Sequence, residues 1–262
     1  SRGNIVPVYS EHIADLETPV SVFSRFAEDQ NMFLLESVEG GERWGRYSFI
    51  GINPYAIFHV ENGKPYLTEG GKTMELPAPN GPLMAMREVL KEARPVSVPG
   101  LPPFFGGAVG YMSYETVNEF EKLPEPKAAL GCPVSCFMLT DEMVIFDNVR
   151  HTIMVSVCVH LDKFASPRAA YDFACSRVNA ISNRIKAPAP ILNSAYANTP
   201  PLESNMTKDE YYKMVNAGKE YIKAGDIIQV VLSQRFSTKL TVKPIQLYRA
   251  LRLINPSPYT FF

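Results

Sequence analysis

Two glycine-containing pairs near the start of the chain separate short segments that are typical of β-strands. Asn62-Gly63 and Gly70-Gly71 are the kind of pair that forms the turn of a β-hairpin. The segments around them are rich in aromatic and β-branched residues, which favour strands. These segments are FLLES (33–37), RYSFIGI (46–52), AIFHVEN (56–62) and KPYLTE (64–69). The first part of the chain is therefore predicted to form an antiparallel meander.

The rest of the chain alternates between blocks of strands and blocks of helices. Apolar residues at helical spacing predict helices at 81–93, 166–185, 207–224 and 244–254. The third helix has the clearest limits, since Thr207 and Glu210 match a capping box and Gly225 suits its end. Further strands are predicted at 137–161, as two long strands joined at Asp147-Asn148, and at 226–236. There is no internal repeat and no βαβ rhythm, which favours an α+β fold with antiparallel sheets.

The best candidate for a linker is the segment KAPAPILNSAYANTPPLESN (186–205). It is rich in proline and small polar residues and has no strong period. It divides the chain into a region at 1–185 and a second region at 206–262.

The overall composition is that of an ordinary soluble protein. The chain has 262 residues, a net charge of −1 and 46% hydrophobic residues. A near-neutral charge argues against nucleic-acid binding, because phosphate recognition needs a basic surface. No apolar run approaches the ~18 residues of a membrane span, and the N-terminus has no signal-peptide pattern. The four cysteines are predicted to be buried, reduced thiols of a cytoplasmic protein.

The glycine-rich segment PPFFGGAVGYMSYE (102–115) invites comparison with a phosphate-binding loop. It lacks the GK[ST] ending, and no helix signal follows it directly. Glycines in a strand more often mark close backbone packing or a bulge, so a structural role is predicted here. The four histidines are scattered, and no motif of specific spacing defines a reaction.

Three short segments could line a small-ligand site, although each also has a purely structural interpretation. In 226–236, one face of the predicted strand carries Gln229, Ser233 and Arg235, which could face either water or a polar cavity. Glu36 and Ser37 end an apolar strand, and a carboxylate beside a hydroxyl suits a free amino acid. NPSPYT (255–260) ends a helix, because the residue before a proline disfavours the α region. It could also present Tyr259 as a stiff aromatic wall.

Four motifs, spread over the chain in a fixed order, resemble component I of anthranilate synthase, the large chorismate-utilising subunit. They are FLLESVEGGERWGRYSFIG (33–51), FFGGAVGYMSYE (104–115), AGDIIQVVLSQRF (224–236) and NPSPY (255–259). The resemblance implies an α+β fold in which two antiparallel sheets pack together with helices outside. It also implies conversion of chorismate and ammonia to anthranilate and pyruvate in tryptophan biosynthesis, with feedback inhibition by L-tryptophan. A glutamine amidotransferase partner, component II, would supply the ammonia.

The resemblance also implies roles for individual residues. The expected L-tryptophan-binding residues are Glu36, Ser37, Arg46, Asn255, Pro256, Pro258, Tyr259 and Thr260. Relatives often carry methionine where this chain has Thr260, which makes that contact less apolar. Gln229 matches the position of a lysine base in relatives that add water to chorismate. A neutral amide cannot act as a general base, so Gln229 favours amination over hydration.

The chain matches only the N-terminal half of that subunit. The family's ligands for Mg²⁺, its chorismate-binding residues and its catalytic histidine are expected beyond Phe262. The fold is therefore predicted to be truncated at a cut, and the fragment to be inactive alone. Two alternatives stay open: component I of aminodeoxychorismate synthase, and a non-catalytic tryptophan-binding module.

Overall fold

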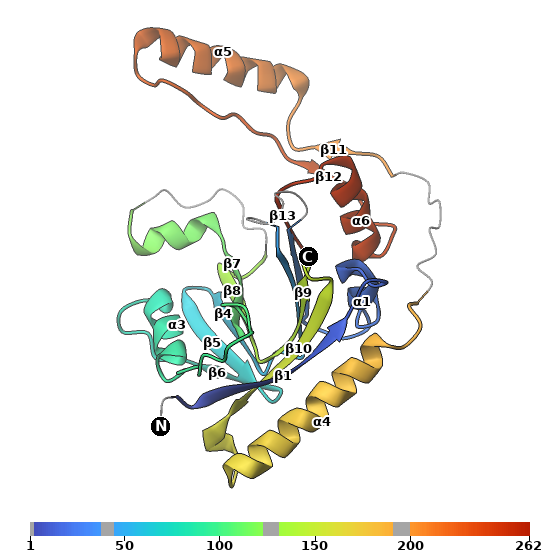
Figure 1. Ribbon diagram of the computed structural model, residues 1–262. Coiled ribbons are helices and arrows are strands. Elements are labelled where there is room, and N and C mark those ends of the chain that lie inside the picture. The colour runs from blue at the N-terminus through green and yellow to red at the C-terminus, as the bar shows by residue number, and fades with distance from the viewer. Residues whose placement is uncertain (1–2, 38–44, 123–130, 191–199) are drawn as a thin grey trace. The chain divides into compact units, whose positions relative to one another are not determined.

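The computed structural model describes residues 3–37, 45–122, 131–190 and 200–262 (Figure 1). Contacts within the chain divide it into two compact units. The first consists of Ser1–Ile191 together with Asn255–Phe262, and the second is Leu192–Ile254. The chain therefore leaves the first unit after residue 191 and returns to it for its last residues. The predicted division into 1–185 and 206–262 stays a prediction about the domains of the whole protein.

The larger sheet of the first unit has six strands in the described part of the chain, and all neighbours are antiparallel. In spatial order these are β1 (Ile5–Ile13), β10 (Thr152–His160), β9 (Glu142–Asp147), β3 (Tyr47–Ile52), β2 (Phe33–Ser37) and β13 (Tyr259–Phe261). The edge strand β13 comes from the end of the chain and lies beside β2 in Figure 1. This sheet therefore joins the first and last described segments of the first unit.

The second sheet contains the predicted hairpins. Its strands, also antiparallel, are β6 (Lys72–Glu75), β5 (Lys64–Glu69), β4 (Ala56–Glu61), β8 (Ser135–Thr140) and β7 (Gly107–Met112). Asn62 and Gly63 have φ angles of 51° and 74°, and Gly70 and Gly71 have 57° and 78°. These positive angles are what a tight hairpin turn requires. The prediction of both turns is thus confirmed, and β7 lies in the glycine-rich segment that was expected to be a strand or a turn.

The prediction of two strands over 137–161 is wrong, because the structure has three. β8 belongs to the second sheet and β9 to the first, and the single residue Asp141 lies between them. The backbone N–H of Cys158 donates to the Asp141 carbonyl over 2.7 Å, which fixes this crossing point. Thr140, Asp141 and Glu142 are polar, but the apolar residues resume at once on either side and no glycine or proline separates the two strands. The turn after Asp147 lies where it was predicted.

The two sheets pack face to face. Phe33, Met143, Ile145 and Met154 of the first sheet form a buried cluster, and Val109 and Met138 of the second sheet pack against it. Helices lie on the outside: α4 (Pro167–Ile185) contacts β1 and β10, α3 (Pro82–Lys91) contacts β5, and α1 (Pro19–Ser24) contacts β2 and β3. Two short 3₁₀ helices, η1 (Tyr114–Glu119) and η2 (Leu161–Lys163), follow β7 and β10. The α+β architecture of packed antiparallel sheets with outer helices is confirmed.

The second unit contains two helices and a small two-stranded sheet. They are α5 (Lys208–Ala224), α6 (Pro244–Ile254), β11 (Glu203–Ser204) and β12 (Phe236–Ser237). The predicted capping box at the start of α5 is present, since the Thr207 hydroxyl accepts from the Glu210 N–H and the Glu210 carboxylate from the Thr207 N–H. Gly225 ends this helix at a φ angle of 81°.

The strand predicted at 226–236 is wrong except at its last residue. Within the described residues only Phe236 and Ser237 have β-ladder partners, Ser204 and Glu203, and the backbone of Arg235 beside them bonds to Asn205. A strand without a neighbour leaves its backbone N–H and C=O groups unpaired, so the preceding residues do not form one. Ile228, for example, is 98% exposed despite its apolar side chain.

The predicted burial of the cysteines is correct for only one of them. Cys158 is buried, Cys136 and Cys175 are half-buried, and Cys132 is exposed, all as free thiols. Cys132 follows Gly131, which has a positive φ angle of 72°, so it lies in a turn rather than in a sheet. None of the helices in the described ranges is both long and apolar enough to cross a bilayer.

Candidate functional site

The pairing of β2 with β13 brings two of the predicted site segments together. Ser37 lies opposite Tyr259, and Glu36 lies opposite Thr260. The Ser37 hydroxyl donates a hydrogen bond of 3.0 Å to the carbonyl of Pro258. These segments are 221 residues apart in the chain, yet they form adjacent strands at one edge of the larger sheet.

The prolines explain why β13 begins where it does. The helix α6 ends at Ile254, immediately before Asn255 and Pro256. A proline has no N–H to donate and disfavours a helical residue before it. Pro258 still offers its carbonyl, which accepts from Ser37, and the regular ladder starts at the next residue. Asn255 and Pro256 therefore lie in the approach to β13, outside its ladder.

Glu36 and Ser37 lie on opposite faces of β2, because successive side chains in a strand alternate. Phe33 and Leu35 belong to the core between the two sheets, so Ser37 shares that face. Glu36 lies on the other face and is 3% exposed. The register places Tyr259 on the face of Ser37 and Thr260 on the face of Glu36. A ligand on the inner face would meet Ser37 and Tyr259.

Arg46 is held by a carboxylate of the neighbouring strand. Its Nε donates to both Asp147 oxygens at 3.1 and 3.2 Å, and its Nη2 donates over 2.7 Å. The guanidinium also lies 4.9 Å from the centre of the Tyr47 ring. The ordered guanidinium keeps a fixed direction at the start of β3, which is the strand next to β2.

Asp147 was not predicted as part of this arrangement. It is 2% exposed and also accepts from the backbone N–H groups of Val149 and Arg150, at 3.2 and 3.1 Å. Burial alone would raise the pKa of the Asp147 carboxyl, but the hydrogen bonds from Arg46 and these N–H groups outweigh it and lower the pKa. The register of β3 with β9 places Tyr47 opposite Asp147 and so brings Arg46 beside it, and the sequence carries no local sign of this pairing.

Gln229 belongs to the second unit, whereas the residues described above belong to the first. It is exposed in the segment of the second unit that forms no strand. The residues described in the first unit and in the second contain no cluster of three His, Cys, Asp or Glu side chains that could hold a metal ion.

A family model described as chorismate binding enzyme matches residues 30–262. The chain belongs to this chorismate-binding enzyme family. Curated relatives of the chain carry the name anthranilate synthase component 1. The proteins from Acetivibrio thermocellus and Synechocystis are each 38% identical, over 99% and 98% of this chain. The protein from Pseudomonas aeruginosa is 36% identical over 99%.

Members of this chorismate-binding family that match here are longer than the chain. The alignments cover 53% of the Acetivibrio protein and 54% of the Pseudomonas protein, so the chain spans about half their length. A crystal structure of anthranilate synthase component I from Streptococcus pneumoniae matches 94% of this chain and 53% of its own. Its TM-score is 0.65 at 23% sequence identity, which supports the fold described above.

Proposed function

We propose that the chain is the N-terminal part of component I of an anthranilate synthase. The whole subunit would convert chorismate and ammonia to anthranilate and pyruvate in tryptophan biosynthesis. A cytoplasmic glutamine amidotransferase subunit would supply the ammonia, and Mg²⁺ would bind to residues beyond Phe262. The relatives that bear this name and align over nearly the whole chain support the proposal. Gln229 supports it as well, because an amide does not activate water as a base.

The second part of the proposal is that β2 and β13 form one wall of an L-tryptophan site that inhibits the enzyme. The observation that carries it is the hydrogen bond from Ser37 to the Pro258 carbonyl, with Tyr259 opposite Ser37. Because the Ser37 proton is donated to Pro258, the hydroxyl and the carbonyl oxygens can both accept from the α-ammonium of an amino acid. The Tyr259 ring is 62% exposed, so it is available to stack against an indole.

Arg46 completes this proposed site as the partner of the inhibitor's carboxylate. Two of its nitrogens donate to Asp147, and the remaining Nη1 group would donate to the carboxylate of the inhibitor. Glu36 and Thr260 would act on the opposite face, through the backbone of the two strands. Asn255 and Pro256 would set the path of the chain into β13.

The experiment uses the full-length protein with chorismate, an ammonium salt and Mg²⁺. Anthranilate fluorescence should appear and should fall on addition of L-tryptophan, whereas the 262-residue fragment should give none. Formation of aminodeoxychorismate would contradict the proposed reaction. Turnover that L-tryptophan leaves unchanged would contradict the proposed site.

A further inference from the structure

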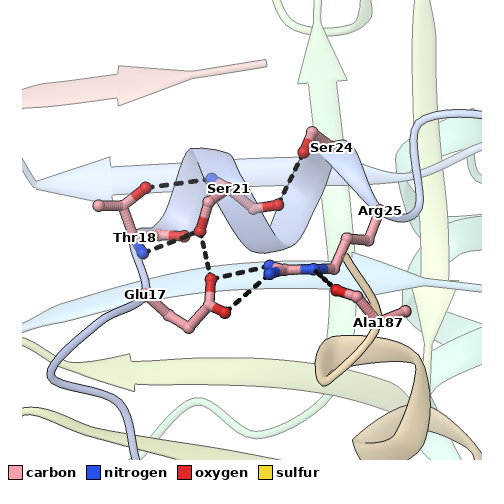
Figure 2. Close-up of polar contacts among 6 residues, drawn as sticks. All are labelled: Glu17, Thr18, Ser21, Ser24, Arg25 and Ala187. Carbon is pink, nitrogen blue, oxygen red and sulfur yellow. Dashed lines mark hydrogen bonds and ion pairs between the residues drawn. The ribbon is translucent and has the colours of Figure 1, made fainter. Parts of the chain in front are cut away.

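One short helix contacts both the segment by which the chain leaves the first unit and the last residue of the segment that returns to it. The chain leaves after α4, and the carbonyl of Ala187 accepts a hydrogen bond of 2.6 Å from Arg25, the residue that ends α1 (Figure 2). It returns through β13, and the Phe262 ring meets the Phe23 ring of α1 edge-on at 5.3 Å. The second unit is therefore connected to the first by two segments that both contact α1.

Arg25 is held in place before it reaches Ala187. Its Nη1 and Nη2 donate to the Glu17 carboxylate at 2.8 and 2.7 Å, which leaves Nε for the Ala187 carbonyl (Figure 2). Glu17 also accepts from the Ser21 hydroxyl over 2.6 Å. The Arg25 side chain is only 9% exposed. A partly buried, two-pronged pair of this kind has a defined geometry, unlike a pair at the surface.

A second arginine makes the reverse connection from α4 to the end of α1. Arg184 donates from Nε to the Arg25 carbonyl at 3.1 Å, and its two terminal nitrogens donate to Asp29, each over 2.7 Å. Its guanidinium also lies 4.4 Å from the centre of the Phe26 ring. These hydrogen bonds join the last turn of α4 to the end of α1, and the Ala187 carbonyl is bound to the same residues.

The opposite side of α1 is tied to the proposed inhibitor site. Phe23 is 1% exposed, and its ring contacts that of Phe262, which is itself 38% exposed. Phe262 and Leu34 exchange two backbone hydrogen bonds of 2.8 and 2.9 Å, which extend the pairing of β13 with β2. A change in the position of β13 would therefore be transmitted to α1 through the contact between Phe262 and Phe23.

We propose that Arg25 is a positioning residue for feedback inhibition. Through α1 it couples ligand binding at the β2–β13 edge to the position of Ala187, where the chain leads into the second unit. This inference rests on the proposed L-tryptophan site. If the contacts only stabilised the fold, their loss would change the free energy of unfolding but not the relation between inhibitor binding and inhibition. Coupling between two sites is measured by that relation.

The test is Arg25→Gln in the full-length enzyme, with L-tryptophan binding measured by calorimetry and inhibition by the anthranilate assay. The tryptophan concentration for half-inhibition should rise at least about tenfold, while the binding constant should change less than about threefold. Arg168→Gln is the matched control, because the Arg168 side chain is 80% exposed and its contacts, with Asp172 and Tyr171, lie within its own helix. It should change neither quantity.

Arg25→Lys provides a second variant in case the first does not fold. A lysine keeps the positive charge, but its single ammonium cannot bond to Glu17 and Ala187 at once as the planar guanidinium does. The tryptophan concentration for half-inhibition should therefore also rise, by a smaller factor than in Arg25→Gln. Half-inhibition that follows the binding constant in these variants, or that does not change, would overturn the inference alone. A wild-type enzyme that binds no L-tryptophan would instead overturn the proposed site, and this inference with it.

Discussion

Asp141, the residue at which the chain crosses from one sheet to the other, makes the clearest prediction about stability. Burial of its side chain, together with the adjacent charge of Glu142, raises the pKa of the carboxyl to about 7 from an ordinary value of 3.8. Lys163 and Arg177 oppose this rise without cancelling it. Arg177 is already engaged in a two-pronged pair with Glu142, at 2.6 and 2.9 Å.

The sign of the effect follows from proton binding in the two states. Between about pH 4 and pH 7 the folded protein keeps a proton on Asp141 that the unfolded chain has released. The free energy of unfolding should therefore fall as pH rises through this window, by about 1.4 kcal/mol per pH unit. The shift from 3.8 to about 7 sets a total of up to about 4 kcal/mol.

Asp141→Asn removes this titration while keeping the shape of the side chain. At pH 4 the variant and the wild type should differ in free energy of unfolding by less than about 1 kcal/mol. At pH 8 the variant should be more stable, by up to about 4 kcal/mol. Urea unfolding followed by far-ultraviolet circular dichroism at both pH values measures this difference.

The control for this experiment is Asp15→Asn, an exposed aspartate that follows β1. As a substitution at an exposed position, it should change the unfolding free energy at pH 8 by less than about 0.5 kcal/mol. An Asp141→Asn variant that is no more stable than the wild type at pH 8 would show that the buried carboxyl is compensated, contrary to the reasoning above.

Two further predictions concern the sheets. Gly110→Ala should destabilise the first unit by about 2 kcal/mol or more, because an added methyl group would collide with the Cys136 carbonyl of the next strand. The thermal unfolding midpoint of the variant should be lower than that of the wild type, and an unchanged midpoint would contradict this prediction. Arg46→Gln should lower the unfolding free energy at pH 7. The pKa of Asp147 is lower in the folded protein, so this carboxylate stabilises the fold at pH values above its pKa in the unfolded chain, and the contribution is lost on acidification. The variant should lose less stability between pH 6 and pH 3 than the wild type does, and equal losses would contradict the role of the pair.

Local chemistry made several elements of the fold predictable. The Asn62-Gly63 turn and the Thr207 capping box act through neighbouring residues only, so their sequence patterns are sufficient. The helix α1 was missed because it has six residues and its capping box uses Ser21 in place of the usual Glu or Gln. The strand at 226–236 failed for a different reason. Its alternating pattern is real, but strand formation needs a partner, which the described residues supply only at Phe236 and Ser237.

The candidate site was predictable only in part. Nothing local in FLLES or NPSPYT shows that Ser37 will bond to Pro258, because this contact closes a loop of most of the chain. The resemblance to a known family supplied that connection. The opposite faces of Glu36 and Ser37 follow from strand alternation, yet which face is the inner one depends on the packing of Phe33 and Leu35. The pairing of Arg46 with Asp147 depends on register, which the sequence does not specify locally.

The most direct test of the proposed site is calorimetric titration of L-tryptophan into the full-length protein. The wild type should bind, and Ser37→Ala should bind at least about tenfold more weakly, because it loses a hydroxyl that bonds across the two strands and to a charged ligand. Thr73→Ala is the control, since that hydroxyl bonds to Thr68 in the second sheet, and its binding should equal that of the wild type. A Ser37→Ala protein that binds L-tryptophan as tightly as the wild type would contradict the assignment of the β2–β13 edge as the inhibitor site.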